Sequence, residues 1–176
     1  MIFVNSTFMN PDMLYLQQNA IHLGVELNEK QLALFDVYQK ELLKWNEKTN
    51  LISEKTTGDI VNRHFLDSLT AAGFITSPNA RIVDIGSGAG FPGIPLKIFL
   101  PSIKLHLLES NRKKVSFLKQ VIRLLKLENT FIIHDRTENI TRMDAWREKF
   151  EIVISRAAFK LSELLLLGQY FLVPEG

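Results

Sequence analysis

The sequence of 176 residues contains no cysteine, which excludes disulfide bridges and thiolate zinc sites. It also lacks a hydrophobic run long enough to cross a bilayer, because the apolar segment LSELLLLGQYFLV is short and includes a glutamate. The N-terminal MIFVNSTFMN has no basic region ahead of its apolar residues, so it does not resemble a secretory signal. We therefore expect a soluble, cytoplasmic protein with no membrane partner.

An excess of charge of either sign is absent as well, since 21 Lys and Arg residues stand against 19 Asp and Glu residues. The resulting net charge of +2 permits a nucleic-acid partner without requiring one. Internal repeats and low-complexity tracts are missing. What the chain does have is an ordinary apolar fraction of 46% and a length that suits one domain.

Helix signals dominate the first third of the chain. Asn10 before Pro11 predicts a helix start, and Gly24 predicts its end. Asn28 with a glutamine three residues later predicts a second helix, and a third is predicted over 59–72. The second helix has one apolar face, made of Leu32, Phe35, Tyr38, Leu42 and Trp45. We expect residues 1–76 to form a helical N-terminal cap.

After residue 76 short apolar strands alternate with helices. The predicted strands are 81–86, 104–110, 130–135 and 150–155, and the predicted helices are 93–99, 111–127 and 161–172. This alternation predicts an α/β fold with a doubly wound parallel sheet and right-handed crossovers. We expect residues 77–176 to form this core and to pack with the cap as one structural unit.

The stretch DIGSGAGFPGIPL, residues 84–96, places four glycines between a strand and a helix. Such a loop brings backbone N–H groups close to a ligand. Gly88, Gly90 and Gly93 fit the dinucleotide fingerprint G-x-G-x-x-G, which is weak on its own. A dinucleotide and S-adenosyl-L-methionine are therefore the two competing ligands.

Three features of the sequence favour S-adenosyl-L-methionine. Asp84 precedes the tight spacing of Gly86 and Gly88, and a carboxylate there suits a cationic ligand better than a pyrophosphate. Pro92 and Pro95 each remove an N–H donor that a pyrophosphate would use. The length also leaves no room for the substrate domain of a dehydrogenase. We predict a methyl-donor site and no metal.

Charged or polar residues stand at or just after the ends of three other predicted strands, at the edge of the sheet where ligands bind. Glu109 stands where an acid holds ribose hydroxyls, and Thr137 with Glu138 stands where the adenine end would lie. Arg156 follows the fourth strand, where a guanidinium reaches the methionyl carboxylate or an acceptor phosphate. A structural ion pair explains Arg156 equally well from spacing alone.

The residues that the sequence lacks limit the range of possible methyl acceptors. Without cysteine, the chain cannot form the covalent cysteine adduct through which pyrimidine C5 is methylated. SRAAFK stands where enzymes that methylate exocyclic amines carry an N-P-P-Y-like sequence. A ring nitrogen such as guanine N7 needs no general base, and carboxylates and small amines remain open. In RHFLDS, Arg63 and Asp67 are spaced for an ion pair, and with His64 they indicate a substrate-facing helix. The basic residues of 112–126 read as a solvated helix surface.

The motifs NLIS, RHFLDS, DIGSGAGFPGIPL, LLES, RKKVSFLKQV, LKLEN and ISRA occur in this order between Leu32 and Gly176. In this the chain resembles the bacterial small-subunit rRNA guanine-N7 methyltransferases of the RsmG type, also called glucose-inhibited division protein B (GidB). The resemblance implies a class I S-adenosyl-L-methionine-dependent methyltransferase with a Rossmann-like sheet. It would act as a monomer on guanine N7 of 16S rRNA, in small ribosomal subunit particles.

The resemblance also assigns residues. The implied substrate-side residues are Arg156, Arg63 and His64. The implied donor site comprises Gly86, Phe91, Glu109, Thr137, Glu138 and Arg156, to which the loop argument adds Asp84 and Gly88.

One departure concerns the end at FLVPEG, where the family's fold continues into a fifth strand and a β-hairpin. We therefore expect C-terminal strands to be missing. A small-molecule methyltransferase and an inactive, truncated donor-binding module are the alternative functions.

Overall fold

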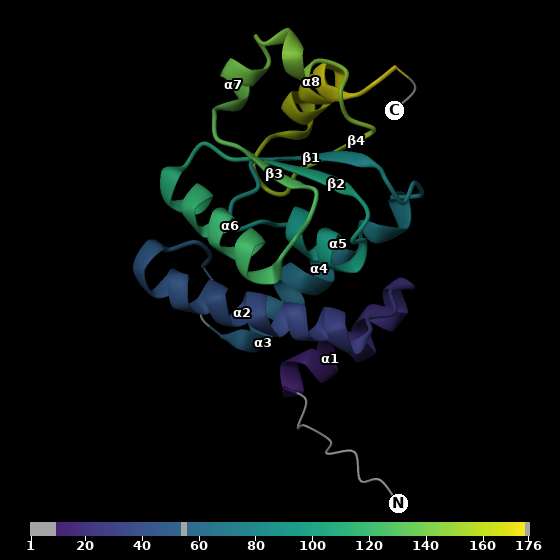
Figure 1. Cartoon of the computed structure of the whole chain (residues 1–176), viewed down its shortest axis with the longest axis vertical. Coiled ribbons are helices and arrows are strands. Elements are labelled where there is room, and N and C mark those ends of the chain that lie inside the picture. The colour runs from purple at the N-terminus through teal and green to yellow at the C-terminus, as the bar shows by residue number, and fades with distance from the viewer. Residues whose placement is uncertain (1–9, 54–55, 175–176) are drawn as a thin grey trace, which may run out of the picture.

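The computed structural model describes residues 10–53 and 56–174, so most of the stretch MIFVNSTFMN lies outside the described residues. Its centre is a sheet of four parallel strands in the order β3-β2-β1-β4 (Figure 1). The strands are β1 (Arg81–Ile85), β2 (Lys104–Leu108), β3 (Thr130–Ile133) and β4 (Ile152–Ile154). The predicted α/β fold with a parallel sheet is confirmed, although each strand is one to three residues shorter than expected.

The order of the strands fixes where a ligand can bind. The chain runs from β1 through β2 to β3 in one direction and then crosses to β4, on the other side of β1. Val83 of β1 therefore pairs with His106 of β2 and with Val153 of β4. The carboxyl ends of β1 and β4 form the switch point of the sheet, which is where doubly wound folds bind ligands.

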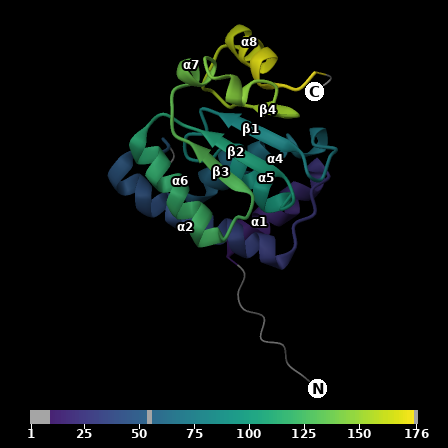
Figure 2. The same ribbon diagram turned by 45° about the horizontal axis from the view of Figure 1, so that its top comes forward.

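Helices cover both faces of the sheet, as Figures 1 and 2 show. On one face lie α5 (Gly93–Phe99) and α6 (Arg112–Leu125), with the N-terminal helices beyond them. On the other face lie α7 (Thr137–Ile140), η4 (Asp144–Trp146) and α8 (Leu161–Phe171). Successive residues of β1 pack on opposite faces of the sheet, since Ile82 is buried in one hydrophobic cluster and Val83 in the other.

The first two N-terminal helices begin at the residues that the sequence indicated, and the first helical stretch ends at the predicted glycine. Asn10 caps α1 (Pro11–Ala20) by accepting the N–H of Asp12 at 3.0 Å, and η1 (Ile21–Leu23) then ends at Gly24, whose φ is +72°. Asn28 and Gln31 form a reciprocal capping box at the start of α2 (Glu29–Thr49). Short-range capping rules were therefore sufficient for these boundaries.

The apolar face of α2 packs into the same core as the sheet. Phe35 and Tyr38 are fully buried, and their rings lie 4.9 and 5.5 Å from the ring of Phe65. The ring of Tyr38 also lies 5.6 Å from Phe91 of the glycine loop. One hydrophobic cluster thus runs from the N-terminal helices to the underside of the sheet.

The third predicted helix is divided into several short segments. These are α3 (Thr57–Ile60), the π-helical segment η2 (Val61–Leu66), α4 (Asp67–Leu69) and the 3-10 turn η3 (Ala72–Phe74). A π-helical turn is wider than an α-helical one and is often found at functional sites. Apolar periodicity cannot predict it, because the change in winding shifts the pattern by a single residue.

Candidate functional site

Two clefts open at the carboxyl ends of the strands, and they meet at Gly86. The acidic cleft has a volume of about 270 Å³ and is lined by Gly86, Leu108, Glu109, Ser110, Asp135, Arg136, Thr137, Glu138 and Phe159. The basic cleft has a volume of about 460 Å³, and its polar lining includes His64, Lys114 and Arg156. Four predicted donor residues line the acidic cleft, and Gly86, Gly88, Phe91, His64 and Arg156 line the basic one.

Glu109 connects the acidic cleft to the glycine loop. Its Oε2 accepts the N–H of Gly88 at 2.9 Å, and its Oε1 accepts the N–H of Asn111 at 2.7 Å. The residue is only 7% exposed, so its carboxylate is fixed between the loop and the start of α6. A carboxylate has about four acceptor positions, and the remaining ones are available to ligand hydroxyls.

Gly86 lines both clefts. Its φ is +73°, and a Cβ at this position would lie 2.6 Å from the Cβ of Ala158, in the loop after β4. Both the backbone conformation and the close approach require glycine. With no side chain here, Gly86 presents only backbone to the two clefts.

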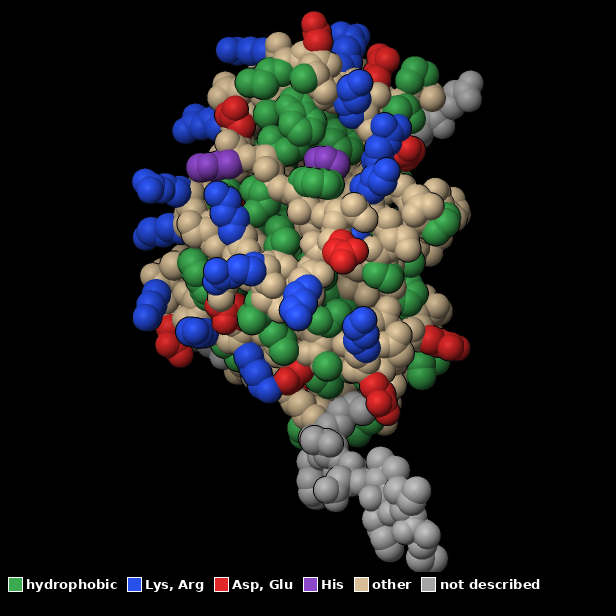
Figure 3. Space-filling model, viewed as in Figure 1, with side chains coloured by type: hydrophobic (Ala, Val, Ile, Leu, Met, Phe, Trp, Pro, Cys, Tyr) green, Lys and Arg blue, Asp and Glu red, His purple; other side chains and the backbone are tan. Residues whose placement is uncertain are grey.

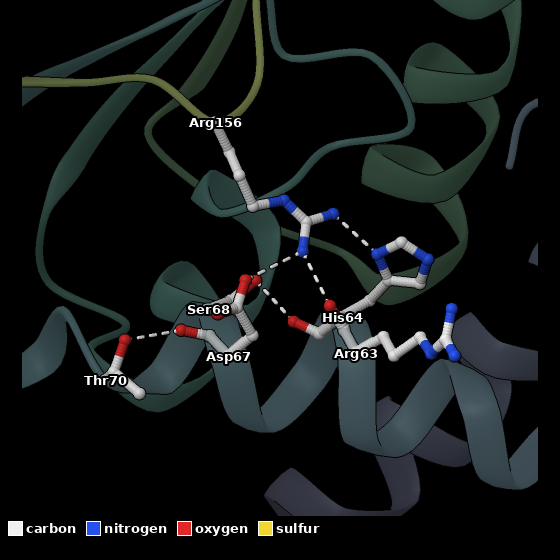
Figure 4. Close-up of polar contacts among 6 residues, drawn as sticks. All are labelled: Arg63, His64, Asp67, Ser68, Thr70 and Arg156. Carbon is white, nitrogen blue, oxygen red and sulfur yellow. Dashed lines mark hydrogen bonds and ion pairs between the residues drawn. The ribbon is translucent and has the colours of Figure 1, made fainter. Parts of the chain in front are cut away.

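Arg156 is held by three groups of the helical segment opposite, as Figure 4 shows. Its Nη1 donates to Oδ2 of Asp67 at 3.0 Å and to the carbonyl of Arg63 at 2.8 Å. Its Nη2 lies 2.5 Å from Nδ1 of His64. The guanidinium carbon also lies 4.9 Å from the ring centre of Phe91, within cation–π range.

This arrangement corrects one expectation. The carboxylate of Asp67 pairs with Arg156, whereas the side chain of Arg63 pairs with Asp59 at 3.9 Å, so the spacing of Arg63 and Asp67 gave the wrong partner. Arg63 contributes its backbone carbonyl, and its side chain is largely exposed outside both clefts. Sequence spacing identified the helix but not which atoms of it are used.

Asp84 lies beneath the glycine loop, outside the linings of both clefts. It is fully buried, and its Oδ2 accepts the N–H of Gly93 at 2.9 Å, at the first residue of α5. Burial raises the pKa of Asp84 to about 7, although the N–H of Gly93 and the charge of Arg156 act in the opposite direction. Asp84 therefore shapes the loop from below.

The sequence did not reveal that Tyr38 contacts the glycine loop. Its hydroxyl donates to the carbonyl of Ala89 at 2.5 Å, and burial raises its pKa well above the ordinary value. A Cβ on Gly90 would lie 2.9 Å from this hydroxyl oxygen. The long helix α2 thus supports the glycine loop directly.

Other lining residues were also missed. In the acidic cleft, Asp135 and Arg136 directly precede Thr137, so their place after β3 was the available signal. In the basic cleft, Ala157 and Ala158 follow Arg156 in the same way. The segment 51–53 also lines this cleft, and nothing in its local pattern indicates that it lies beside the glycine loop.

Two further kinds of feature, a membrane span and a metal site, can be assessed in the described part of the chain. None of its helices has both the length and the apolar character needed to cross a membrane. Within the same residues, histidine and acidic side chains do not gather in groups of three or more that could hold a metal ion.

Comparison with known proteins identifies one family and several relatives that share its name. Residues 31–176 match the GidB family, described as rRNA small subunit methyltransferase G. A protein of that name from Syntrophus aciditrophicus is 46% identical over 161 residues, covering 91% of this chain and 67% of the relative. Another from Desulforamulus reducens is 41% identical over 176 residues, covering 96% of this chain and 73% of the relative. The chain thus spans about two thirds to three quarters of these relatives.

Solved structures resemble the fold. TYW2 from M. jannaschii, crystallised with AdoMet, is 23% identical with a TM-score of 0.55, over 64% of this chain and 49% of that one. A SAM-dependent methyltransferase from Thiobacillus denitrificans, in complex with S-adenosyl-L-homocysteine, is 19% identical with a TM-score of 0.50, over 77% and 52%. At these identities the likeness concerns the fold alone.

Proposed function

Because the chain belongs to the GidB family, we propose that it transfers a methyl group from S-adenosyl-L-methionine to N7 of a guanine in 16S rRNA. The observation that carries the proposal is the meeting of an acidic and a basic cleft at Gly86, at the switch point of the sheet. We further propose that the protein acts as a monomer in the cytoplasm, on 16S rRNA or the small-subunit particle.

The residues of the two clefts fit the donor. In this proposal the ribose hydroxyls bind Glu109, which keeps free acceptor positions, and the adenine lies near Thr137 and Glu138. The methionyl part passes Gly86, where no side chain blocks the way, and its carboxylate binds Arg156. Opposite ends of the donor thus meet groups of matching chemistry.

The reaction requires these residues mainly to align the donor with the acceptor. When bound, the donor supplies an electrophilic methyl group, which guanine N7 can accept with its lone pair without losing a proton. A general base is therefore unnecessary. Fixing the donor and presenting N7 in line with it is the contribution that the chain has to make.

The proposal is tested first by titrating S-adenosyl-L-homocysteine into the protein by calorimetry, with NAD as the control. Binding of the former alone supports a methyl-donor site, and binding of NAD alone would favour an oxidoreductase. Labelled methyl transfer to 16S rRNA and to small-subunit particles follows, with digestion to nucleosides to identify 7-methylguanosine. Donor binding without transfer would indicate an inactive module, and transfer only to small acceptors a small-molecule enzyme.

The face of α6 provides a prediction about the RNA partner. This helix carries Arg112, Lys113, Lys114, Lys119 and Arg123 but no acidic residue, and Lys126 follows it. Figure 3 shows Lys and Arg side chains gathered along the left margin of the molecule, where Figure 1 places α6 and α2. Since Lys114 lines the basic cleft, the row of cations leads toward the candidate site.

Reversing three of these charges separates RNA binding from donor binding. In the triple variant K119E/R123E/K126E, we expect rRNA methylation at physiological salt to fall by at least about tenfold. The affinity for S-adenosyl-L-homocysteine should not change, because the three residues lie outside both clefts. The matched control K30E/R142E/K149E reverses three exposed cations on other elements. Equal losses in both variants would show that only total charge matters.

A further inference from the structure

The π-helical segment η2 places two different hydrogen-bond acceptors against the guanidinium of Arg156. Arg63 and His64 are adjacent in it, and the carbonyl of the first and Nδ1 of the second both lie within hydrogen-bond distance of Arg156. Asp67, at the start of α4, provides the third acceptor. The wider winding of the π turn allows a backbone carbonyl to bond outside the helix.

The contact with Arg156 defines the protonation state of His64. A guanidinium in a protein only donates hydrogen bonds, so Nδ1 of His64 must accept and Nε2 must carry the proton. The imidazole is neutral in this arrangement. The residue is 8% exposed, and its ring stacks on Phe91 with 4.6 Å between ring centres and 14° between planes. Both the position and the tautomer of the ring are thereby fixed.

We infer that His64 is a positioning residue that acts through Arg156. Its neutral Nδ1, with the Asp67 carboxylate and the Arg63 carbonyl, occupies three of the five N–H donors of the guanidinium. The remaining two are available to a ligand in the basic cleft, which Arg156 lines. The inference rests on the proposed function, in which that ligand group is the carboxylate of the methyl donor.

Protonation of His64 reverses the contact. With a proton on Nδ1 the ring would present a donor to a donor, so Arg156 would lose one of its three acceptors and donor affinity would fall toward acid pH. Within the described residues, charged and titratable groups near the pair come from several neighbouring elements. They are Asp59, Arg63 and Asp67 on the same helical segment, Tyr38 on α2, Asp84 below the loop, and Lys114 on α6.

The first experiment reads the tautomer in the wild-type protein without a ligand. A two-bond ¹H–¹⁵N correlation spectrum at neutral pH should show Nδ1 of His64 as the unprotonated nitrogen and Nε2 as the protonated one. A proton on Nδ1 would overturn the inference. This result does not depend on whether the protein binds a methyl donor, so it separates the inference from the proposed function.

The second experiment uses two complementary variants and S-adenosyl-L-homocysteine as the probe. H64N keeps an acceptor at the position of Nδ1 but loses the ring stack, whereas H64F keeps the stack and loses the acceptor. We expect the Kd to rise about tenfold in H64F and to stay within about threefold in H64N. We also expect the acid-side loss of affinity in the wild type to be absent in H64N.

Other outcomes have distinct meanings. A greater loss in H64N than in H64F would assign His64 to packing against Phe91, and unchanged affinity in both would remove it from the site. Either result overturns the inference while leaving the methyl-donor proposal intact. Circular dichroism establishes that each variant is folded, and the tautomer measurement decides the matter if H64F is not. A folded wild type that binds no S-adenosyl-L-homocysteine would instead overturn the proposed function.

Discussion

Gly86→Ala is expected to weaken binding of S-adenosyl-L-homocysteine by about 100-fold, close to 3 kcal/mol. The new Cβ would lie 2.6 Å from the Cβ of Ala158, so the loop after β4 must move away from the glycine loop. Because Gly86 lines both clefts, that movement changes the lining of each. Calorimetric titration of the folded variant measures the effect directly.

A matched control separates this effect from backbone strain. Gly24 has almost the same φ, +72° against +73°, but a Cβ there would meet nothing within 4 Å, and it lies far from the clefts along the chain. Gly24→Ala should therefore lose about 1–2 kcal/mol of stability from the left-handed conformation alone and retain full affinity. If Gly86→Ala binds as well as Gly24→Ala, the close approach of Gly86 to Ala158 is not needed for donor binding.

The elements of the fold were largely predictable because their signals are local. Asn10, Gly24 and Asn28 act on backbone groups within three residues, and the strand ending at Asp84 is followed at once by its glycine loop. Each of these signals depends on residues adjacent in the sequence. The family motifs, which are also short, pointed to the glycine loop for the same reason.

The contacts that organise the site could not be predicted in this way. Asp67 and Arg156 are 89 residues apart, and Tyr38 and Ala89 are 51 apart, so only the packing of the helices against the sheet brings them together. The spacing rule for helices paired Asp67 with Arg63, since it considers only neighbours on one helix. A guanidinium aligned by three acceptors outcompetes that local pair.

For Asp84, the sequence indicated that a carboxylate lies near the glycine loop, but it did not reveal what that carboxylate contacts. The sequence placed a carboxylate beside the donor, but the structure buries it against the first N–H of α5. A Cβ on Gly93 would lie 2.7 Å from the carboxylate oxygen, so this glycine is required by the close approach of Asp84. The motif DIGSGAGFPG therefore encodes internal support as well as a ligand surface.

The burial of Asp84 predicts a pH-dependent stability that Asp84→Asn should remove. In the unfolded chain this carboxyl ionises near 3.8, and in the folded protein near 7. Between these values the folded state holds one more proton, so stability falls as the pH rises through the interval. At about 1.4 kcal/mol per pH unit, the full interval of about 3 units amounts to roughly 4 kcal/mol.

Urea unfolding of the wild type and of Asp84→Asn at pH 5, 6, 7 and 8 measures this contribution. Asparagine keeps an oxygen that can accept the N–H of Gly93, while its NH₂ replaces Oδ1, which has no hydrogen-bond partner among the described residues. The absolute stabilities will therefore differ by a constant, and the slope is the informative quantity. We expect the variant to gain roughly 2–3 kcal/mol on the wild type between pH 5 and 7, and little more above pH 8. Parallel curves would mean that Asp84 is ionised in the folded protein throughout this range, with the Arg156 charge and the Gly93 N–H outweighing burial.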